Sequence, residues 1–262
     1  MSGDNSIEVN NVTYIADGKT IIKDITFGLN PGELIGVIGP NGAGKSTLIK
    51  NMVRIVEPDS GDVTLMGEPV SHYDAQAFAR SVAYVPQSTE FTFPITVEEA
   101  VLMGRIPHLS GVRMEGAHDY TVSEQCLKVV GMEDFAERLV TSLSGGERQL
   151  VAIGRALVQE PAFLLMDEPT SNLDIHHQLT IMGLLVELTR SGKGILVVLH
   201  DLTLASRFCT KILAMSGGRV VSFGTPAEVL TEETISRTFR VSIRIERNEQ
   251  TGSTIIEPLE PL

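Results

Sequence analysis

Residues 39–46 combine glycines, a lysine and a serine in a spacing suited to binding a polyphosphate. The segment reads Gly39-Pro40-Asn41-Gly42-Ala43-Gly44-Lys45-Ser46 and is followed by Thr47. Glycines let the backbone wrap tightly, so that several N–H groups converge on a phosphate at a helix N-terminus. We expect residues 39–47 to bind a nucleotide, with Lys45 reaching the β- and γ-phosphates and the Ser46 hydroxyl binding Mg²⁺. A plain strand-to-helix turn is the simpler alternative.

Two adjacent acids end the apolar run 163–166, which reads Phe-Leu-Leu-Met. Ligands of open α/β sheets bind at the carboxyl ends of the strands, and this is where Asp167 and Glu168 fall. We expect Asp167 to hold Mg²⁺ through water and Glu168 to polarise an attacking water as the general base. An acid that caps a helix after a strand is the structural alternative; the phosphate-binding pattern upstream favours catalysis.

The elements around the glycine-rich segment are those that would place it at the edge of a sheet. Residues 33–39 form a nearly continuous apolar strand that runs into it, and residues 46–55 have helical spacing after it. Upstream, residues 7–15 and 20–27 flank Asp17-Gly18, a dipeptide suited to a tight hairpin turn. These patterns predict an antiparallel β region followed by strand, loop and helix.

Helices and strands alternate from residue 145 onward, which is typical of a parallel sheet built from βαβ units. The predicted helices are 145–159, 175–190 and 202–208, and the predicted strands are 162–167, 194–199 and 211–215. Residues 87–143 have helical spacing instead, and Thr96 with Glu99 forms a capping-box pattern. A last hairpin is predicted at 241–246 and 253–256, with its turn at 250–252.

Charge and composition exclude several classes of protein. The 262 residues include 33 acidic and 21 basic side chains, a formal net charge of −12, which disfavours a nucleic-acid-binding surface. Cys126 and Cys209 lie far apart, so neither a disulfide scaffold nor a zinc site is expected. No secretory signal is visible. The longest apolar runs are far shorter than the ~20 residues of a membrane span, so we expect no bilayer crossing by this chain.

Three further segments, together with the two motifs above, form a specific order of motifs along the chain. Leu143-Ser144-Gly145-Gly146-Glu147 precedes Asp167, His200 follows it, and Gln87 lies upstream. With the two motifs above, residues 7–240 resemble the ATP-binding-cassette (ABC) ATPases. The resemblance implies an α/β, P-loop NTPase fold: a RecA-like parallel-sheet core, an N-terminal antiparallel β subdomain and an α-helical subdomain. It implies one domain over 1–262, whose parts are a core (1–86 and 144–240), a helical subdomain (87–143) and a hairpin tail (241–262).

The resemblance also implies roles for single residues. Tyr14 would stack on adenine, Gln87 would bind Mg²⁺ and water, and His200 would contact the γ-phosphate. Ser144, Gly145 and Gly146 resemble the signature loop, which in the family faces the nucleotide of a second subunit. Its helix N-terminus suits a phosphate. Ser171-Asn172-Leu173-Asp174 resembles the D-loop, and we count Asp174 with the nucleotide-binding residues.

One copy of each motif implies a head-to-tail homodimer, or pairing with a close paralogue, around two ATP molecules. Glu147 stands where Gln is commonest in the signature loop. It resembles a variant of several importer ATPases, so we do not interpret it as loss of activity. His176 and His177 are expected to be a solvated helix start rather than metal ligands.

A narrower resemblance concerns the type of transporter. Several short segments are similar to the ATPase subunits of importers for ferric siderophores, haem and cobalamin. They are Gly104-Arg105, Pro107-His108, Glu147-Arg148-Gln149, His177-Gln178 and residues 228–231. Phe239-Arg240 departs from the more usual Tyr-Gly, and a helix end followed by a proline stop also explains residues 105–108. The similarity implies a separate membrane permease docked on residues 87–115, a solute-binding protein outside, and a cytoplasmic location on the inner face of the membrane.

Two other functions remain open. A soluble ABC ATPase without a permease, such as an iron–sulfur-cluster assembly factor, fits the length of the chain. A regulatory nucleotide-binding module without turnover is the third option. Lys45, Asp167, Glu168 and His200 are all present, which favours a working ATPase.

Overall fold

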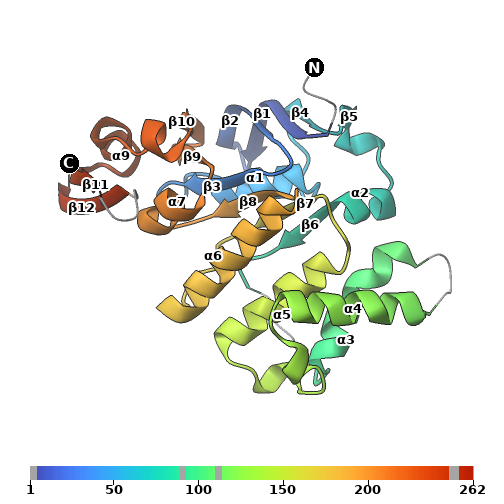
Figure 1. Ribbon diagram of the computed structural model, residues 1–262. Helices are drawn as coiled ribbons and strands as arrows, with labels where there is room; N and C mark the ends of the chain where they lie inside the picture. Colours follow the sequence, from blue (N-terminus) through green and yellow to red (C-terminus); the bar gives the residue numbers. More distant parts are fainter. Residues whose placement is uncertain (1–4, 89–92, 110–113, 248–253, 262) are drawn as a thin grey trace.

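Two β-sheets meet around the strand that leads into residues 39–46, and a group of helices extends from the larger sheet (Figure 1). The computed structural model describes residues 5–88, 93–109, 114–247 and 254–261. The smaller sheet is antiparallel, in the order β2(Lys19–Leu29), β1(Ile7–Ala16), β4(Ser60–Leu65) and β5(Glu68–Pro69). Asp17 and Gly18 connect β1 to β2 with φ angles of 49° and 72°, as expected for a tight hairpin.

The larger sheet is parallel except for one edge strand. Its order is β10(Arg219–Gly224), β9(Lys211–Ser216), β3(Leu34–Ile38), β8(Gly194–Val198), β7(Phe163–Met166) and β6(Val82–Val85). Only β10 pairs antiparallel, with β9. Because β3, β7 and β8 are buried on both faces, they are apolar at nearly every position.

The helices divide between the two faces of this sheet. They are α1(Lys45–Met52), α2(Ala75–Ser81), α3(Val97–Leu102), α4(Ala117–Val129), α5(Gly145–Leu157), α6(Ile175–Arg190), α7(Leu202–Phe208), α8(Pro226–Val229) and α9(Glu232–Phe239). Short 3₁₀ turns are η1(Val70–His72), η2(Met103–His108), η3(Glu133–Phe135) and η4(Val140–Ser142). In Figure 1, α3, α4 and α5 gather below the sheet and pack against one another.

Alternating residues of the central strands contribute to two separate hydrophobic cores. Ile35 and Val37 of β3 pack with α1 and the antiparallel sheet. Leu34 and Ile38 pack on the other face, in a core that continues through α5 and α6 into α3 and α4. The helical segment therefore shares its core with one face of the sheet, so the position of α5 is set by both.

Several elements differ in extent from the sequence-based predictions. Helix α1 ends at Met52, three residues before the predicted end, and Arg54 then adopts a left-handed φ of 61°. Elements α2, α8, α9 and β10 were not predicted, because short segments carry too little periodicity. The predicted turn at 250–252 lies outside the described residues, and β11(Val241–Arg247) and β12(Thr254–Pro261) extend further than expected.

No helix in the described part of the chain is both long and apolar enough to span a membrane. The expected α/β class, with a parallel core sheet, an antiparallel N-terminal sheet and a helical segment, is confirmed. The division into core, helical subdomain and tail stays a prediction.

Candidate functional site

The glycine-rich segment leaves the end of β3 and opens α1, with its lysine folded inside the loop. Lys45 Nζ donates to the carbonyl oxygens of Gly39 at 2.8 Å and Pro40 at 3.1 Å, and only 5% of the residue is exposed. Burial lowers the pKa of Lys45, while the nearby carboxylates of Glu168 and Asp167 act in the opposite direction. The ammonium group is thus held at the loop, where a phosphate would complete its hydrogen bonds.

A cavity of about 270 Å³ opens directly over this loop. It is lined by Asn41, Gly42, Ala43, Gly44, Lys45, Ser46, Thr47, Ile21 and Glu168. Backbone N–H groups at the first turn of α1 have no partners within the helix and favour an anion. The cavity therefore brings together a helix N-terminus, a buried cation and a carboxylate.

Ser46 and Asp167 come together although 121 residues separate them. Ser46 Oγ donates to Asp167 Oδ1 at 3.1 Å, and Asp167 is nearly fully buried at the end of β7. Burial is the main cause that raises the pKa of Asp167, and the neighbouring Glu168 adds to it. A hydroxyl and a buried carboxylate are the hard oxygen donors that Mg²⁺ takes together with phosphate oxygens and water. The pair therefore fits Mg²⁺.

Glu168 holds two of the expected residues with its two carboxylate oxygens. Gln87 Nε2 donates to Oε2 at 2.7 Å, and His200 Nε2 lies 2.6 Å from Oε1. These residues follow β6, β7 and β8, three adjacent parallel strands, so their carboxyl ends bring the side chains together. Glu168 also has a left-handed φ of 50°, and the Ser171 hydroxyl donates to its carbonyl oxygen at 2.9 Å. The strained backbone is fixed by the loop that follows it.

Tyr14 is placed relative to the phosphate loop through its strand neighbour. It is half-buried on β1 and opposite Ile22 of β2, while Ile22 packs against Gly44 of the loop. This placement puts the tyrosine on the strand pair beside the phosphate loop.

Ser144, Gly145 and Gly146 form the start of α5, away from the loop of the same chain. Ser144 is exposed and caps the helix in a box with Glu147: Glu147 N donates to Ser144 Oγ at 3.3 Å, and Ser144 N to Glu147 Oε2 at 2.7 Å. No hydrogen bond between described residues joins Ser144–Gly146 to the loop 39–46. One chain by itself thus leaves this helix start facing outward.

The start of α6 packs beside the start of α5. Asp174 caps α6 by accepting from His177 N at 3.0 Å, and its other oxygen lies 2.8 Å from His177 Nδ1. A Cβ at Gly146 would collide with the imidazole of His177 unless that ring moved, so the two helix starts are in close contact. His177 is therefore not a freely solvated residue: it links the two helix starts.

The sequence reasoning missed Ile21 in the lining of the cavity and Asp201 beside His200. Asp201 Oδ1 accepts from Thr203 N at 2.7 Å and Leu204 N at 3.0 Å, which fixes the start of α7 directly after His200. An acid directly before the first residue of a predicted helix is a capping signal that could have revealed Asp201.

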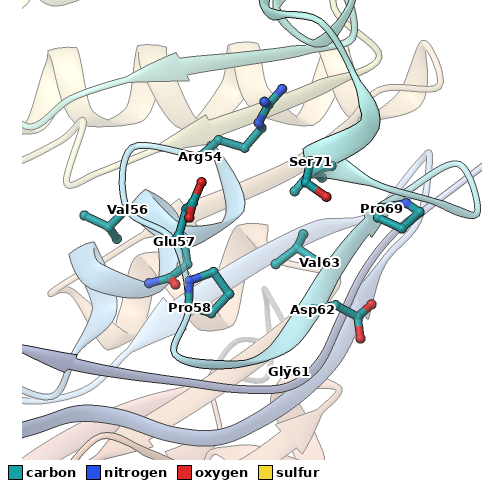
Figure 2. A pocket seen from close by; sticks show the side chains of 11 residues that line it. Arg54, Val56, Glu57, Pro58, Gly61, Asp62, Val63, Pro69 and Ser71 are labelled. Carbon is teal, nitrogen blue, oxygen red and sulfur yellow. The ribbon is translucent and has the colours of Figure 1, made fainter.

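A second pocket lies beyond the C-terminal end of α1 (Figure 2). Its volume is about 330 Å³, and its lining includes Arg54, Glu57 and Asp62. The Arg54 guanidinium donates to the Tyr73 carbonyl at 2.8 Å and lies over the Phe78 ring, so it is engaged elsewhere. With two acids and no residue expected to bind nucleotide, this pocket is separate from the phosphate site.

Comparison with known proteins places the chain in a family. The family model described as ABC transporter matches residues 22–171, which include the loop, the signature segment and the acidic pair. This chain belongs to the ABC transporter family. The resemblance inferred from the motifs is confirmed.

Individual ABC transporter proteins resemble the chain along most of its length. A hemin import ATP-binding protein of Hahella chejuensis is 40% identical, covering 89% of this chain and 92% of that protein. A cobalamin import ATP-binding protein of Halobacterium salinarum is 37% identical over 97% of this chain, which spans only 64% of that relative. A solved metal-chelate type ABC transporter in an inward-facing conformation superposes with a TM-score of 0.86, 29% identity and 97% coverage of both chains.

Proposed function

We propose that this chain is the ATP-hydrolysing subunit of an importer of metal chelates, of the ferric-siderophore, haem or cobalamin type. The observation that carries the enzymatic part is the position of Glu168, which holds Gln87 and His200 next to the phosphate loop. The similarity to hemin and cobalamin import proteins and to a metal-chelate type transporter supports the import part.

In the proposed mechanism, different side chains bind the nucleotide and accept the proton of water. Lys45 and the first turn of α1 bind the β- and γ-phosphates, and Tyr14 stacks on the adenine ring. Glu168 accepts the proton of the attacking water, and His200 turns to the γ-phosphate once the nucleotide is present. Mg²⁺, bound by Ser46 and Asp167 with Gln87 nearby, supplies neutralisation of the phosphate charge.

The exposed start of α5 is completed by a second copy of the chain. In the proposed head-to-tail homodimer, Ser144, Gly145 and Gly146 face the phosphate loop of the partner, and Asp174 lies at the same interface. Each ATP is then contacted from both sides, so nucleotide binding stabilises the closed dimer.

The permease docks on residues 87–115, at the inner face of the membrane. Within the described part of this range, Phe93, Met103, Ile106 and Met114 are large apolar side chains exposed to solvent. Contiguous exposed apolar groups mark protein interaction sites. The permease receives its ligand from a solute-binding protein outside, and the chain itself is cytoplasmic and peripheral.

Glu168→Gln tests the general base. We expect ATP turnover to fall at least 100-fold, because an amide does not accept the proton of water, while ATP binding persists and the chain accumulates as a dimer. Phosphate release and gel filtration with ATP measure both. Glu124→Gln, an exposed change on α4, is the matched control. Turnover like that of the parent would contradict the assignment of Glu168.

Affinity purification from detergent-solubilised membranes tests the transport role. A polytopic membrane protein is expected to co-purify with the tagged chain and to stimulate its ATPase activity. Replacement of Met103 and Ile106 by Ser should release it, whereas Val129→Ser, at an exposed apolar residue of α4, should not. Recovery of a purely soluble assembly complex would instead support an ABC ATPase without a permease, and binding without phosphate release a regulatory module.

A further inference from the structure

Arg105 is a buried cation in η2, outside the nucleotide site. Only 2% of the residue is exposed. Its Nε donates to Asp119 Oδ1 of α4 at 2.8 Å, and its Nη1 donates to Glu160 Oε2 at 2.7 Å and to the Val158 carbonyl oxygen at 2.8 Å. One side chain thus joins three segments of the chain. Pro107 is the next-to-last residue of η2, so a helical turn that ends at a proline still describes residues 105–108, and the contacts of Arg105 come in addition to it.

The segment that Arg105 holds, residues 158–162, connects α5 to β7. Two further side chains contact this connection. His108 Nε2 lies 2.9 Å from the Gln159 carbonyl oxygen, and Lys193 Nζ donates to the Pro161 carbonyl oxygen at 2.6 Å. A side chain at Gly104 would collide with the Arg155 backbone, so glycine lets η2 lie directly on α5. Glu160 adopts a left-handed φ of 54° within this connection.

Each end of this connection leads to half of the proposed catalytic apparatus. Helix α5 begins at the cap Ser144, and β7 ends directly before Asp167 and Glu168. On its outer side, η2 exposes Met103 and Ile106, which belong to the proposed docking surface. The buried guanidinium therefore lies between the proposed docking surface and the connection from α5 to β7.

We propose that Arg105 is a positioning residue that couples the permease-facing turn η2 to the α5–β7 connection. The inference rests on the proposed function, because the coupling acts on a permease. Directional hydrogen bonds to a carbonyl and two carboxylates fix the relative position of three segments, which apolar packing alone does not do. Such a cluster is weak evidence for a gain in stability, since apolar replacements of buried ion pairs are often as stable.

The test compares ATPase rates of the full-length chain alone and in the complex that co-purifies with it. Arg105→Lys keeps the charge but loses the planar fork of donors, and we expect the ratio of complexed to free rate to fall about tenfold. The KM for ATP should change less than twofold. Glu160→Gln, at a half-exposed partner, should lower the ratio by about threefold. Arg190→Met, at the exposed end of α6, should keep the parental ratio.

A purely structural role predicts a different result. Loss of folded chain lowers both rates together and leaves their ratio unchanged, and an unchanged ratio in Arg105→Lys overturns the proposal. If no membrane protein co-purifies with the parent chain, the proposed function fails instead. Amide hydrogen exchange of the isolated chain then tests whether Arg105 fixes the α5–β7 connection. We then expect residues 158–162 to exchange about tenfold faster in Arg105→Lys; exchange like that of the parent would refute it.

Discussion

Glu168 combines a left-handed backbone with a carboxylate whose two oxygens are both engaged. One oxygen accepts from Gln87 Nε2 and the other lies 2.6 Å from His200 Nε2, so the carboxylate holds both side chains at the edge of the sheet. In the proposed mechanism, ATP would exchange these contacts for contacts to phosphate, and Glu168 would respond to the nucleotide as well as act as the base.

Lys45→Ala tests the phosphate loop at the scale of one residue. The ammonium group is buried and bonded to two loop carbonyls, so its removal takes away a charge-assisted contact to phosphate. We expect ATP affinity to fall about 100-fold, measured by calorimetry on the full-length chain. Lys50→Ala, at an exposed lysine of the same helix, is the control and should bind within about threefold. Unchanged affinity in Lys45→Ala would contradict the assigned role.

Helix α5 joins two functions through its ends. Its first residue follows the exposed Ser144 cap, which lies at the proposed dimer interface, and its last turn leads to the connection held by Arg105. Because most of α5 is buried in the core shared with the sheet, packing fixes the positions of both of its ends.

The capping box of α5 makes this element sensitive to acid. The hydrogen bond from Ser144 N, and then the Ser144 hydroxyl, lower the pKa of Glu147. A lowered pKa gives stability that is present above the ordinary glutamate value of 4.5 and lost as pH falls through the folded-state pKa.

Glu147→Gln should remove this dependence, because an amide oxygen accepts the same bond at every pH. We expect urea unfolding of the variant to lose less stability than the parent between pH 7 and pH 3.5, by about 0.5 kcal/mol after discounting for solvent screening. ATP turnover should persist. Parallel pH profiles of the two proteins would show that the box does not titrate.

At the scale of the whole molecule, the two halves of the proposed ATP site lie on different surfaces of one chain. The phosphate loop and Ser144 share no hydrogen bond among the described residues, and Ser144 is exposed. In Figure 1 the helices α3, α4 and α5 gather below the larger sheet, and α5 contacts β6 as well as α3 and α4. A second copy is the proposed completion of the site.

Ser144→Arg tests this arrangement against Ser144→Ala. Both variants lose the capping hydroxyl, which costs about 1 kcal/mol, but only arginine adds bulk at the proposed interface. In a Glu168→Gln background with ATP, the alanine variant should elute as a dimer and the arginine variant as a monomer with nearly parental ATP affinity. A normal dimer of the arginine variant in gel filtration would contradict the proposal that Ser144 faces the nucleotide of a second copy.

The local chemistry of the site was predictable from the sequence. Residue type and spacing were enough to predict the chemistry of the loop 39–46 and the run 163–168, because phosphate binding needs glycines and a lysine within one turn. The order of the motifs was enough to identify the family, and helix Leu202–Phe208 was located without error. Short elements such as α2, α8 and β10 were not predicted, because fewer than about eight residues give a weak periodic signal; α7 is equally short, but it falls within the regular alternation of helices and strands.

Only the tertiary structure decided which of these residues meet. Gln87, Glu168 and His200 come together because β6, β7 and β8 are neighbours in the sheet, an order that no local pattern encodes. The burial of Arg105 between Asp119 and Glu160 has the same origin: its partners are set by packing, whereas its own segment resembles an ordinary helix end. Residue type and spacing determine the chemistry that each segment carries, and long-range packing determines where that chemistry is assembled.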